Sequence, residues 1–281
     1  MRYANAIDFR RALTDRLNDQ ARREGAGVSQ LQRRVAFERF LARLFHSGNE
    51  RWVLKGGYAL ELRLGGKARA TVDIDLSVPP PPFDDLLDLL QEAAEHDLDD
   101  FFSFRIMQAA RPLQGPPLGG HRFMVNAILA GKTFTKFAID VGQGDEPMYP
   151  IEWLNGQVNL EFAGLPPLRF PSYPLADHFA EKLHAYTKPR ENPSRVKDLI
   201  DMALILELGL QANAGLADAI RATFDRYNTH PLPDDFPAPP ASWLEPFEGS
   251  AKELELRPSS AMEWHERIAV FLKRAFDFKS G

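Results

Sequence analysis

Cysteine is absent from this 281-residue chain. Disulfide bonds and thiolate metal sites are therefore excluded, and the composition fits a reducing compartment. The sequence also lacks an apolar run long enough to span a bilayer, and its first residues carry no apolar secretory segment. We therefore expect a cytoplasmic protein with no membrane partner.

An excess of positive charge is lacking as well, since the formal net charge is -5. This argues against a protein that coats nucleic acid by bulk charge alone. Arginines nevertheless crowd the first fifth of the chain, where they either steer a polyanion to one side or line solvated helix faces. They are Arg10, Arg11, Arg16, Arg22, Arg23, Arg33, Arg34, Arg39 and Arg43.

With 44% apolar and 26% charged residues, the chain has the composition of an ordinary globular protein long enough for two domains. We predict a sheet with N-terminal helices in residues 1–170 and a helical domain in residues 171–281. Strands are predicted at 51–55, 71–78, 101–110, 122–130, 133–142 and 158–162. Helices are predicted at 29–45 with Ser29 as the N-cap, and at 58–64, 83–97, 175–187, 195–208, 214–227 and 259–278, with an extended proline-rich connection at 230–240.

Two aspartates one residue apart, Asp73 and Asp75, stand in an apolar, β-branched run. Successive side chains of a strand point to opposite faces, so the two carboxylates share one face while Val72, Ile74 and Leu76 occupy the other. Such a pair repels unless a cation lies between its members. A divalent ion, completed by substrate phosphates, removes that repulsion. The alternative is an edge strand with a solvated acidic face.

A third carboxylate and a glycine pair extend this pattern. Asp140 lies in another β-type run, from which it could project beside the first two aspartates, and three carboxylates can hold two metal ions. Taken alone, Asp140 could equally end a strand. The pair Gly56-Gly57, between a strand and a helix, would let backbone N–H groups approach phosphate oxygens, although the same pair also suits an ordinary turn.

These motifs together carry a family resemblance. The order Leu54-Lys55-Gly56-Gly57-Tyr58, then Arg69-x-Thr71-x-Asp73-Ile74-Asp75, resembles the first motif of the nucleotidyltransferase superfold and, more narrowly, the AbiEii toxin family of type IV toxin–antitoxin systems. Two later helical motifs of that family match Glu181-Lys182-Leu183-His184-Ala185 and Arg195-Val196-Lys197-Asp198-Leu199-Ile200-Asp201, in the same order. The resemblance covers roughly residues 53–206. It implies an α+β fold, with a mixed nucleotidyltransferase-type sheet flanked by helices and a C-terminal helical domain.

The resemblance also implies roles for individual residues. Many nucleotidyltransferases have a serine where Gly57 stands, so backbone amides must bind phosphate there, and Thr71 would be a phosphate contact or a modification site. Catalysis would fall to Asp73, Asp75, Lys182 and Asp198. The implied metal ligands for Mg²⁺ or Mn²⁺ are Asp73, Asp75 and Asp140, and the implied nucleotide contacts are Lys55, Gly56, Gly57, Thr71 and Lys182.

The residue chemistry of the two helical motifs is coherent. Lys182 and Asp198 lie on consecutive predicted helices. Prolines end the first helix, and Ser194 can cap the second. An antiparallel pair of these helices would present both side chains to one cleft. The ammonium of Lys182 would bind triphosphate oxygens, and Asp198 would orient it or accept a proton. Asp201, one turn later, would support them from the same helix face. Alternatively, these are a surface lysine and an aspartate favoured by the helix dipole.

The function implied is Mg²⁺-dependent transfer of a nucleotide from a nucleoside triphosphate to an acceptor. The resemblance points to the tRNA 3′ end as that acceptor, which would block translation, and to a cognate antitoxin of the AbiEi type as a partner. Arg22, Arg23, Arg33 and Arg34 would then contact the RNA backbone. Two alternatives stay open: transfer to a protein or a small molecule such as an antibiotic, and a degenerate nucleotide-binding interaction module without activity.

Overall fold

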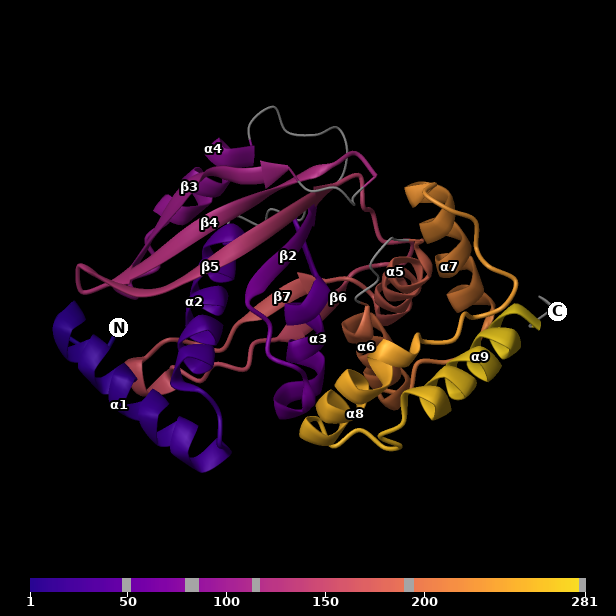
Figure 1. The fold of residues 1–281 in the computed structure, drawn as a ribbon. Helices are drawn as coiled ribbons and strands as arrows, with labels where there is room; N and C mark the ends of the chain where they lie inside the picture. The colour runs from indigo at the N-terminus through magenta and orange to yellow at the C-terminus, as the bar shows by residue number, and fades with distance from the viewer. Residues whose placement is uncertain (47–51, 79–85, 113–116, 190–194, 278–281) are drawn as a thin grey trace. The chain divides into compact units, whose positions relative to one another are not determined.

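A computed structural model describes residues 1–46, 52–78, 86–112, 117–189 and 195–277 (Figure 1). The chain divides into two compact units, which we call the sheet unit and the helical unit. The sheet unit contains Met1–Arg63, Ala70–Glu146 and Glu152–Ser172, and the helical unit contains Leu64–Arg69, Pro147–Ile151 and Tyr173–Gly281. The predicted domain boundary at residue 170 stays a prediction. Among the helices that the structure describes, none has the length and apolar character needed to cross a membrane.

The sheet unit is built on one seven-stranded mixed sheet with the order β3-β4-β5-β2-β1-β7-β6. Two neighbouring pairs, β2 with β5 and β1 with β7, run parallel, and the other pairs run antiparallel. The predicted α+β class with a mixed sheet is confirmed. The strands are β1 (Val53–Lys55), β2 (Asp73–Val78), β3 (Phe102–Pro112), β4 (Gly120–Leu129), β5 (Lys132–Gln143), β6 (Glu152–Asn155) and β7 (Arg169–Ser172).

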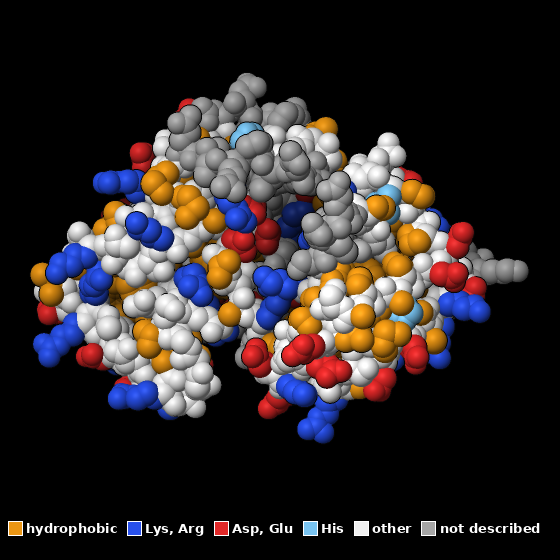
Figure 2. Space-filling model, viewed as in Figure 1, with side chains coloured by type: hydrophobic (Ala, Val, Ile, Leu, Met, Phe, Trp, Pro, Cys, Tyr) orange, Lys and Arg blue, Asp and Glu red, His pale blue; other side chains and the backbone are white. Residues whose placement is uncertain are grey.

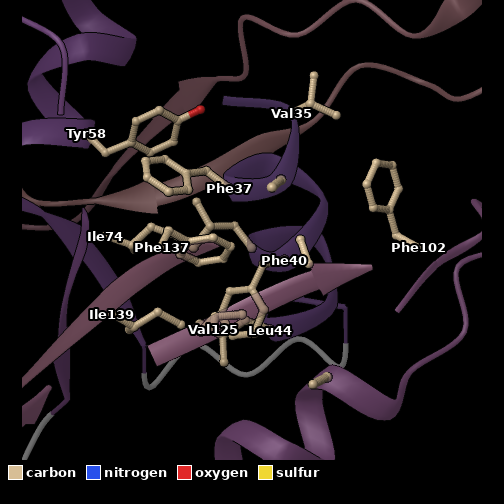
Figure 3. Packing of buried hydrophobic residues seen from close by; sticks show 14 of the residues in the cluster. Val35, Phe37, Phe40, Leu44, Tyr58, Ile74, Phe102, Val125, Phe137 and Ile139 are labelled. Carbon is tan, nitrogen blue, oxygen red and sulfur yellow. The ribbon is translucent and has the colours of Figure 1, made fainter. Parts of the chain in front are cut away.

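One face of this sheet is covered by helices α2 and α4, which contact each other as well as the strands (Figure 1). Strand residues alternate between the two faces, and the helix-facing ones form a fully buried core in which Phe37 of α2 meets Phe137 of β5 edge to face at 4.9 Å (Figure 3). The carboxylate-bearing residues therefore lie on the other face. The helices of this unit are α1 (Ala6–Glu24), α2 (Val28–Leu44), α3 (Gly56–Leu64) and α4 (Leu86–Glu95).

The helical unit confirms four predicted helices and adds one that was not predicted. Two of the predicted helices, α5 and α7, have the predicted bounds, and the other two agree to within two residues. The added helix, α8, follows the proline-rich connection, and its burial rests on Phe247 and Ala251, too few apolar residues for a clear helical pattern. The helices are α5 (Leu175–Thr187), α6 (Val196–Glu207), α7 (Ala214–Tyr227), α8 (Leu244–Glu253) and α9 (Ala261–Asp277).

The sequence prediction is wrong at residues 158–162 and at Ser29. The strand expected at 158–162 does not form, because the carboxylate of Glu38 accepts the backbone N–H groups of Gln157 and Val158 at 2.6 and 3.1 Å, and a single helical turn follows at Glu161–Ala163. The sheet is instead completed by β6 and β7. Ser29 is not an N-cap, since α2 already begins at Val28. The helix start predicted at residues 83–85 and the cap at Ser194 lie outside the described residues.

Several N-terminal arginines are structural. The guanidinium of Arg10 donates to three carbonyls of the β4–β5 hairpin at 2.6 to 3.1 Å. Arg39 and Arg43 are buried and bind both oxygens of Asp100, at 2.6 to 2.9 Å. Arg34, proposed above as an RNA contact, pairs with buried Glu61 and has little exposed surface to offer. On the face shown in Figure 2, the exposed basic side chains are interspersed with acidic and uncharged ones.

Candidate active site

The three predicted carboxylates come together on the face of the sheet opposite the one that α2 and α4 cover. Ile74 and Leu76 of β2 are fully buried in the core, which directs Asp73 and Asp75 to the opposite face. In the parallel pairing of β2 with β5, Asp75 lies directly opposite Asp140. The strand alternation and the register thus place all three acids on one surface, as the sequence indicated.

An arginine that the sequence analysis did not identify joins this cluster. Arg122 of β4 lies opposite Asp140 in the antiparallel pair β4–β5. Its Nε and Nη2 donate to the two oxygens of Asp140, each at 2.6 Å, and Nη2 also donates to Oδ2 of Asp73 at 2.9 Å. The hydrogen bonds with Asp140 raise the pKa of Arg122, with further charge contributions from Asp140, Asp73 and Asp75. The guanidinium is therefore permanently charged and bridges two of the three carboxylates.

The glycine pair lies directly against the second aspartate. Gly56 has the left-handed φ of 64°, and a Cβ atom added there would lie 1.9 Å from Oδ2 of Asp75. The next backbone N–H, that of Gly57, points to the same oxygen at 3.4 Å. Position 56 therefore requires glycine for two reasons, backbone conformation and the space taken by the Asp75 carboxylate. The result is a close approach of backbone amides to the acidic strand.

Comparing Gly56→Ala with an alanine substitution at a matched glycine should separate the effect of the left-handed backbone from that of the contact with Asp75. Gly131, in the turn between β4 and β5, has a similar φ of 69° but nothing within 4 Å of an added Cβ. We expect both alanine variants to lose about 1 kcal/mol of stability from the left-handed backbone. Only Gly56→Ala should displace Asp75, which we expect to lower nucleotide transfer about 100-fold. Equal activities of the two variants in a transfer assay would contradict this assignment.

Thr71 contacts the acidic strand and is not part of it. Strand β2 begins at Asp73, two residues later than predicted, which leaves the side chain of Val72 60% exposed instead of in the core. The Thr71 hydroxyl lies 3.2 Å from Oδ1 of Asp73, and its backbone N–H donates to buried Glu61 at 3.2 Å. Thr71 thus orients the Asp73 carboxylate. Its predicted contact with a phosphate stays a prediction.

Lys55 ends strand β1, where it lies opposite Asp75 in the antiparallel pair with β2. Its ammonium binds Oδ2 of Asp145 at 2.6 Å, and the Asp145 side chain is fully buried. This ion pair fixes the lysine stem at the edge of the acidic surface. The predicted role of Lys55 in nucleotide binding stays a prediction.

The chemistry of the acidic surface suits one divalent ion better than two. Among the described residues, no group of three or more carboxylate or imidazole side chains is arranged to hold a metal. Asp140 is engaged by Arg122 on both oxygens, Asp73 by Arg122 and Thr71 on one oxygen each, and Asp75 by the backbone N–H of Gly57. With Arg122, the three acids carry a net charge of about -2, which one divalent ion neutralises. Asp73 and Asp75 are oxygen donors of the kind that Mg²⁺ prefers, and they fit such an ion when substrate phosphates complete its ligands.

The predicted lysine and aspartate motifs form a separate charged cluster in the helical unit. Lys182 of α5 binds Oδ2 of Asp201 at 2.8 Å and lies 3.7 Å from Oδ1 of Asp198, both on α6. Asp201, predicted only as a supporting residue, is therefore the closer partner of the lysine. Arg195 binds Asp198 at 3.2 Å, and Arg69 forms a two-point contact with Asp201 at 3.0 and 3.1 Å. Three cations and two anions give this cluster a net charge of +1.

Burial and charge together set the protonation states of this cluster. Burial alone would raise the pKa of Asp201, but Lys182 and Arg69 outweigh it and lower that pKa to about 2. Burial would likewise lower the pKa of Lys182, but Asp201 and Asp198 outweigh it and raise that pKa. Lys182 therefore stays protonated at neutral pH. It can act as a cation and not as a proton acceptor.

Sequence reasoning missed five residues at these clusters, namely Arg122, Glu61, Asp145, Arg69 and Arg195. Arg69 and Arg195 each open a motif that carried the family resemblance, so their positions in the motifs were a usable signal. Arg122, Glu61 and Asp145 gave no such signal. A lone arginine in a predicted strand shows its partner only when the register of β4 with β5 is known, and that register is set by pairings across the sheet.

The mixed sheet, with two aspartates on one strand beside the two glycines that begin α3, is the arrangement expected of a nucleotidyltransferase fold. The family model described as nucleotidyl transferase AbiEii toxin, type IV TA system, matches residues 39–277. The chain therefore belongs to the AbiEii family of nucleotidyltransferase toxins of type IV toxin–antitoxin systems.

Comparison of structures agrees with this fold. MenT4, the nucleotidyltransferase toxin Rv2826c from Mycobacterium tuberculosis H37Rv, superposes with a TM-score of 0.62 over 96% of this chain and 90% of its own, at 20% sequence identity. JHP933 from Helicobacter pylori is more distant, with a TM-score of 0.47 and 15% identity over 84% of this chain and 88% of its own. No protein with a curated description matches the sequence significantly.

Proposed function

We propose that this protein transfers a nucleotide from a nucleoside triphosphate to the 3′ end of tRNA in a Mg²⁺-dependent reaction. In that reaction an acceptor hydroxyl oxygen attacks the α-phosphorus, a new P–O bond forms, and the bond to the bridging oxygen breaks, so that pyrophosphate leaves. The observation that carries the proposal is the acidic face of the sheet, where Asp73 and Asp75 share one strand and Asp140 lies opposite in register.

The residues of the sheet unit have complementary roles in this proposal. Asp73 and Asp75 would hold the metal ion, which supplies charge neutralisation for the leaving pyrophosphate and lowers the pKa of the attacking hydroxyl. Thr71 holds Asp73 by its hydroxyl, and the backbone amide of Gly57 points to the Asp75 carboxylate. The absence of a side chain at Gly56 keeps the Asp75 carboxylate in place.

Within the helical unit, Lys182 is the cation that we propose for binding phosphate oxygens. Lys182 is only 14% exposed at its side chain, yet it is kept protonated by Asp201 and Asp198. The net charge of +1 on its cluster favours a polyanion, and a lysine ammonium binds phosphate oxygens as a compact charge. Asp198, in the first turn of α6, would orient this lysine or accept the proton of the acceptor hydroxyl.

Transfer to tRNA and neutralisation by a cognate AbiEi-type antitoxin are the finer parts of the proposal. Membership of a type IV toxin–antitoxin family supports an antitoxin partner. Support for tRNA as the acceptor comes from the family resemblance. The N-terminal arginines add little to it, because part of their charge is neutralised within the fold. Of the four arginines expected to contact RNA, Arg34 is engaged with Glu61 and Arg22 with Asp19.

The experiment that tests the proposal supplies the protein with each of the four labelled nucleoside triphosphates, Mg²⁺ and total RNA. We expect label in tRNA, removable by a 3′ exonuclease, with one nucleotide preferred. Chelation of the metal by EDTA should reduce incorporation to background, and excess Mg²⁺ or Mn²⁺ should restore it. Mass spectrometry of the labelled tRNA would then identify both the nucleotide and the acceptor position.

Other outcomes discriminate among the alternatives. Label found only in protein or in a small molecule would exclude tRNA as the acceptor while leaving the transfer chemistry in place. No incorporation under any condition, together with binding of the triphosphate, would favour the non-enzymatic nucleotide-binding module.

A further inference from the structure

The guanidinium of Arg122 is a cation that bridges two of the three carboxylates on the acidic face. It binds both oxygens of Asp140 and the Oδ2 atom of Asp73, so one cation joins two acids from adjacent strands. Its side chain is 39% exposed, against 24% and 15% for its two partners. The bridge is therefore within reach of solvent, and an ion from solution can compete for the same oxygens.

Both oxygens of Asp73 are occupied within the protein. Oδ2 accepts from Arg122 at 2.9 Å, and Oδ1 lies 3.2 Å from the Thr71 hydroxyl. A carboxylate offers about four lone-pair positions, so Asp73 can still bind a metal ion. A second cation at Oδ2 would nevertheless meet the positive guanidinium at close range, which raises the cost of binding it.

We propose that Arg122 is a built-in competitor for the divalent cation, which weakens metal binding to the free protein and keeps Asp140 from serving as a metal ligand. This inference rests on the proposed metal-dependent function. Arg122 holds the charge of Asp140 and part of that of Asp73, which limits the negative charge that these two acids offer to an ion. The triphosphate then adds the negative charge and the oxygen ligands that the acidic face alone does not supply.

This arrangement gives Arg122 a positioning role distinct from catalysis. In the free protein it prevents repulsion among three acids on one face of the sheet. A bound metal ion would supply the neutralisation of Asp73, while Arg122 would keep its two-point contact with Asp140. Metal binding is thereby coupled to nucleotide binding.

Titration of the free protein with Mn²⁺, followed by the EPR signal of unbound Mn²⁺, tests the proposal without any measurement of activity. We expect Arg122→Gln to bind Mn²⁺ about tenfold more tightly than wild type, because one positive charge is removed beside the ion. Arg122→Lys retains the charge and should stay within about threefold of wild type. Arg105→Gln, which removes an exposed arginine from β3, is the matched control and should not change the affinity.

The melting temperature provides a second readout, which does not require the protein to bind Mn²⁺ tightly. Without Arg122 the three acids repel, so Arg122→Gln should melt at a lower temperature than wild type in EDTA, and Mg²⁺ should raise its melting temperature more than that of wild type. Equal Mn²⁺ affinity in wild type and Arg122→Gln, or equally tight binding by Arg122→Gln and Arg122→Lys, would overturn the competitor role.

The failure of this inference can be distinguished from that of the proposed function by Asp75→Asn. If Asp75→Asn weakens Mn²⁺ binding but Arg122→Gln leaves it unchanged, the metal site stands and only the role of Arg122 is overturned. If Asp75→Asn leaves Mn²⁺ binding unchanged, the acidic face is not the metal site and both proposals fail.

Discussion

Substitution of Asp75 by asparagine is expected to lower nucleotide transfer by at least about a thousandfold. Asparagine has the size of aspartate and can still accept the backbone N–H of Gly57, which lies 3.4 Å from the Asp75 carboxylate. It lacks the negative charge that a divalent ion requires, and the loss of a metal ligand removes stabilisation of the leaving pyrophosphate. The measurement is the initial rate of incorporation of labelled nucleotide at saturating Mg²⁺.

The stability of the same variant separates a catalytic from a structural role. Asp75 shares its face with Asp73 and Asp140 and lies opposite Lys55 of β1, so removing its charge relieves two repulsions and weakens an attraction. We therefore expect a melting temperature close to that of wild type, because these effects oppose each other. Asp19→Asn, an exposed carboxylate on α1, is the matched control and should retain full activity. An Asp75→Asn protein as active as wild type would require the catalytic assignment to be abandoned.

The acidic face could be predicted from the sequence because its determinants are local. Alternation within one strand decides that Asp73 and Asp75 share a face, and the apolar residues between and beside them decide which face is buried. The helix bounds of α5 and α7 follow in the same way from a periodicity carried by each segment itself. Resemblance to a family added the order of the motifs along the chain.

The features that escaped prediction depend on partners distant in sequence. Glu38 of α2 accepts the backbone N–H groups of Gln157 and Val158, which are 119 and 120 residues away. These hydrogen bonds hold the segment as a loop in place of the expected strand. Arg122 meets Asp140 only because β4 and β5 pair in one particular register. Neither contact leaves a pattern within its own segment, since the register of a sheet is fixed by packing and by turn geometry elsewhere.

The prediction with the largest expected effect on stability concerns Asp201 in the helical unit. Its side chain is completely buried and binds Lys182 at 2.8 Å and Arg69 at 3.0 and 3.1 Å. Asp201→Asn leaves these two cations without a counter-charge at that position, and removing one partner of a buried ion pair costs about 3 kcal/mol or more. The matched control is Asp218→Asn on α7, whose exposed pair with Arg221 should contribute less than about 0.5 kcal/mol.

The pH dependence of this effect follows from the lowered pKa of Asp201. Its pKa is about 2 in the folded protein against an ordinary value of 3.8, so its contribution is fully present above about pH 4 and is lost as the pH falls through 2. The difference in unfolding free energy between wild type and Asp201→Asn should be constant from pH 7 to pH 5 and about 1 kcal/mol smaller at pH 3. Guanidinium chloride unfolding, followed by far-ultraviolet circular dichroism, measures this difference. A difference at pH 3 as large as that at pH 7 would show that the stabilisation by Asp201 does not depend on its charge, and the ion-pair account of this cluster would then be wrong.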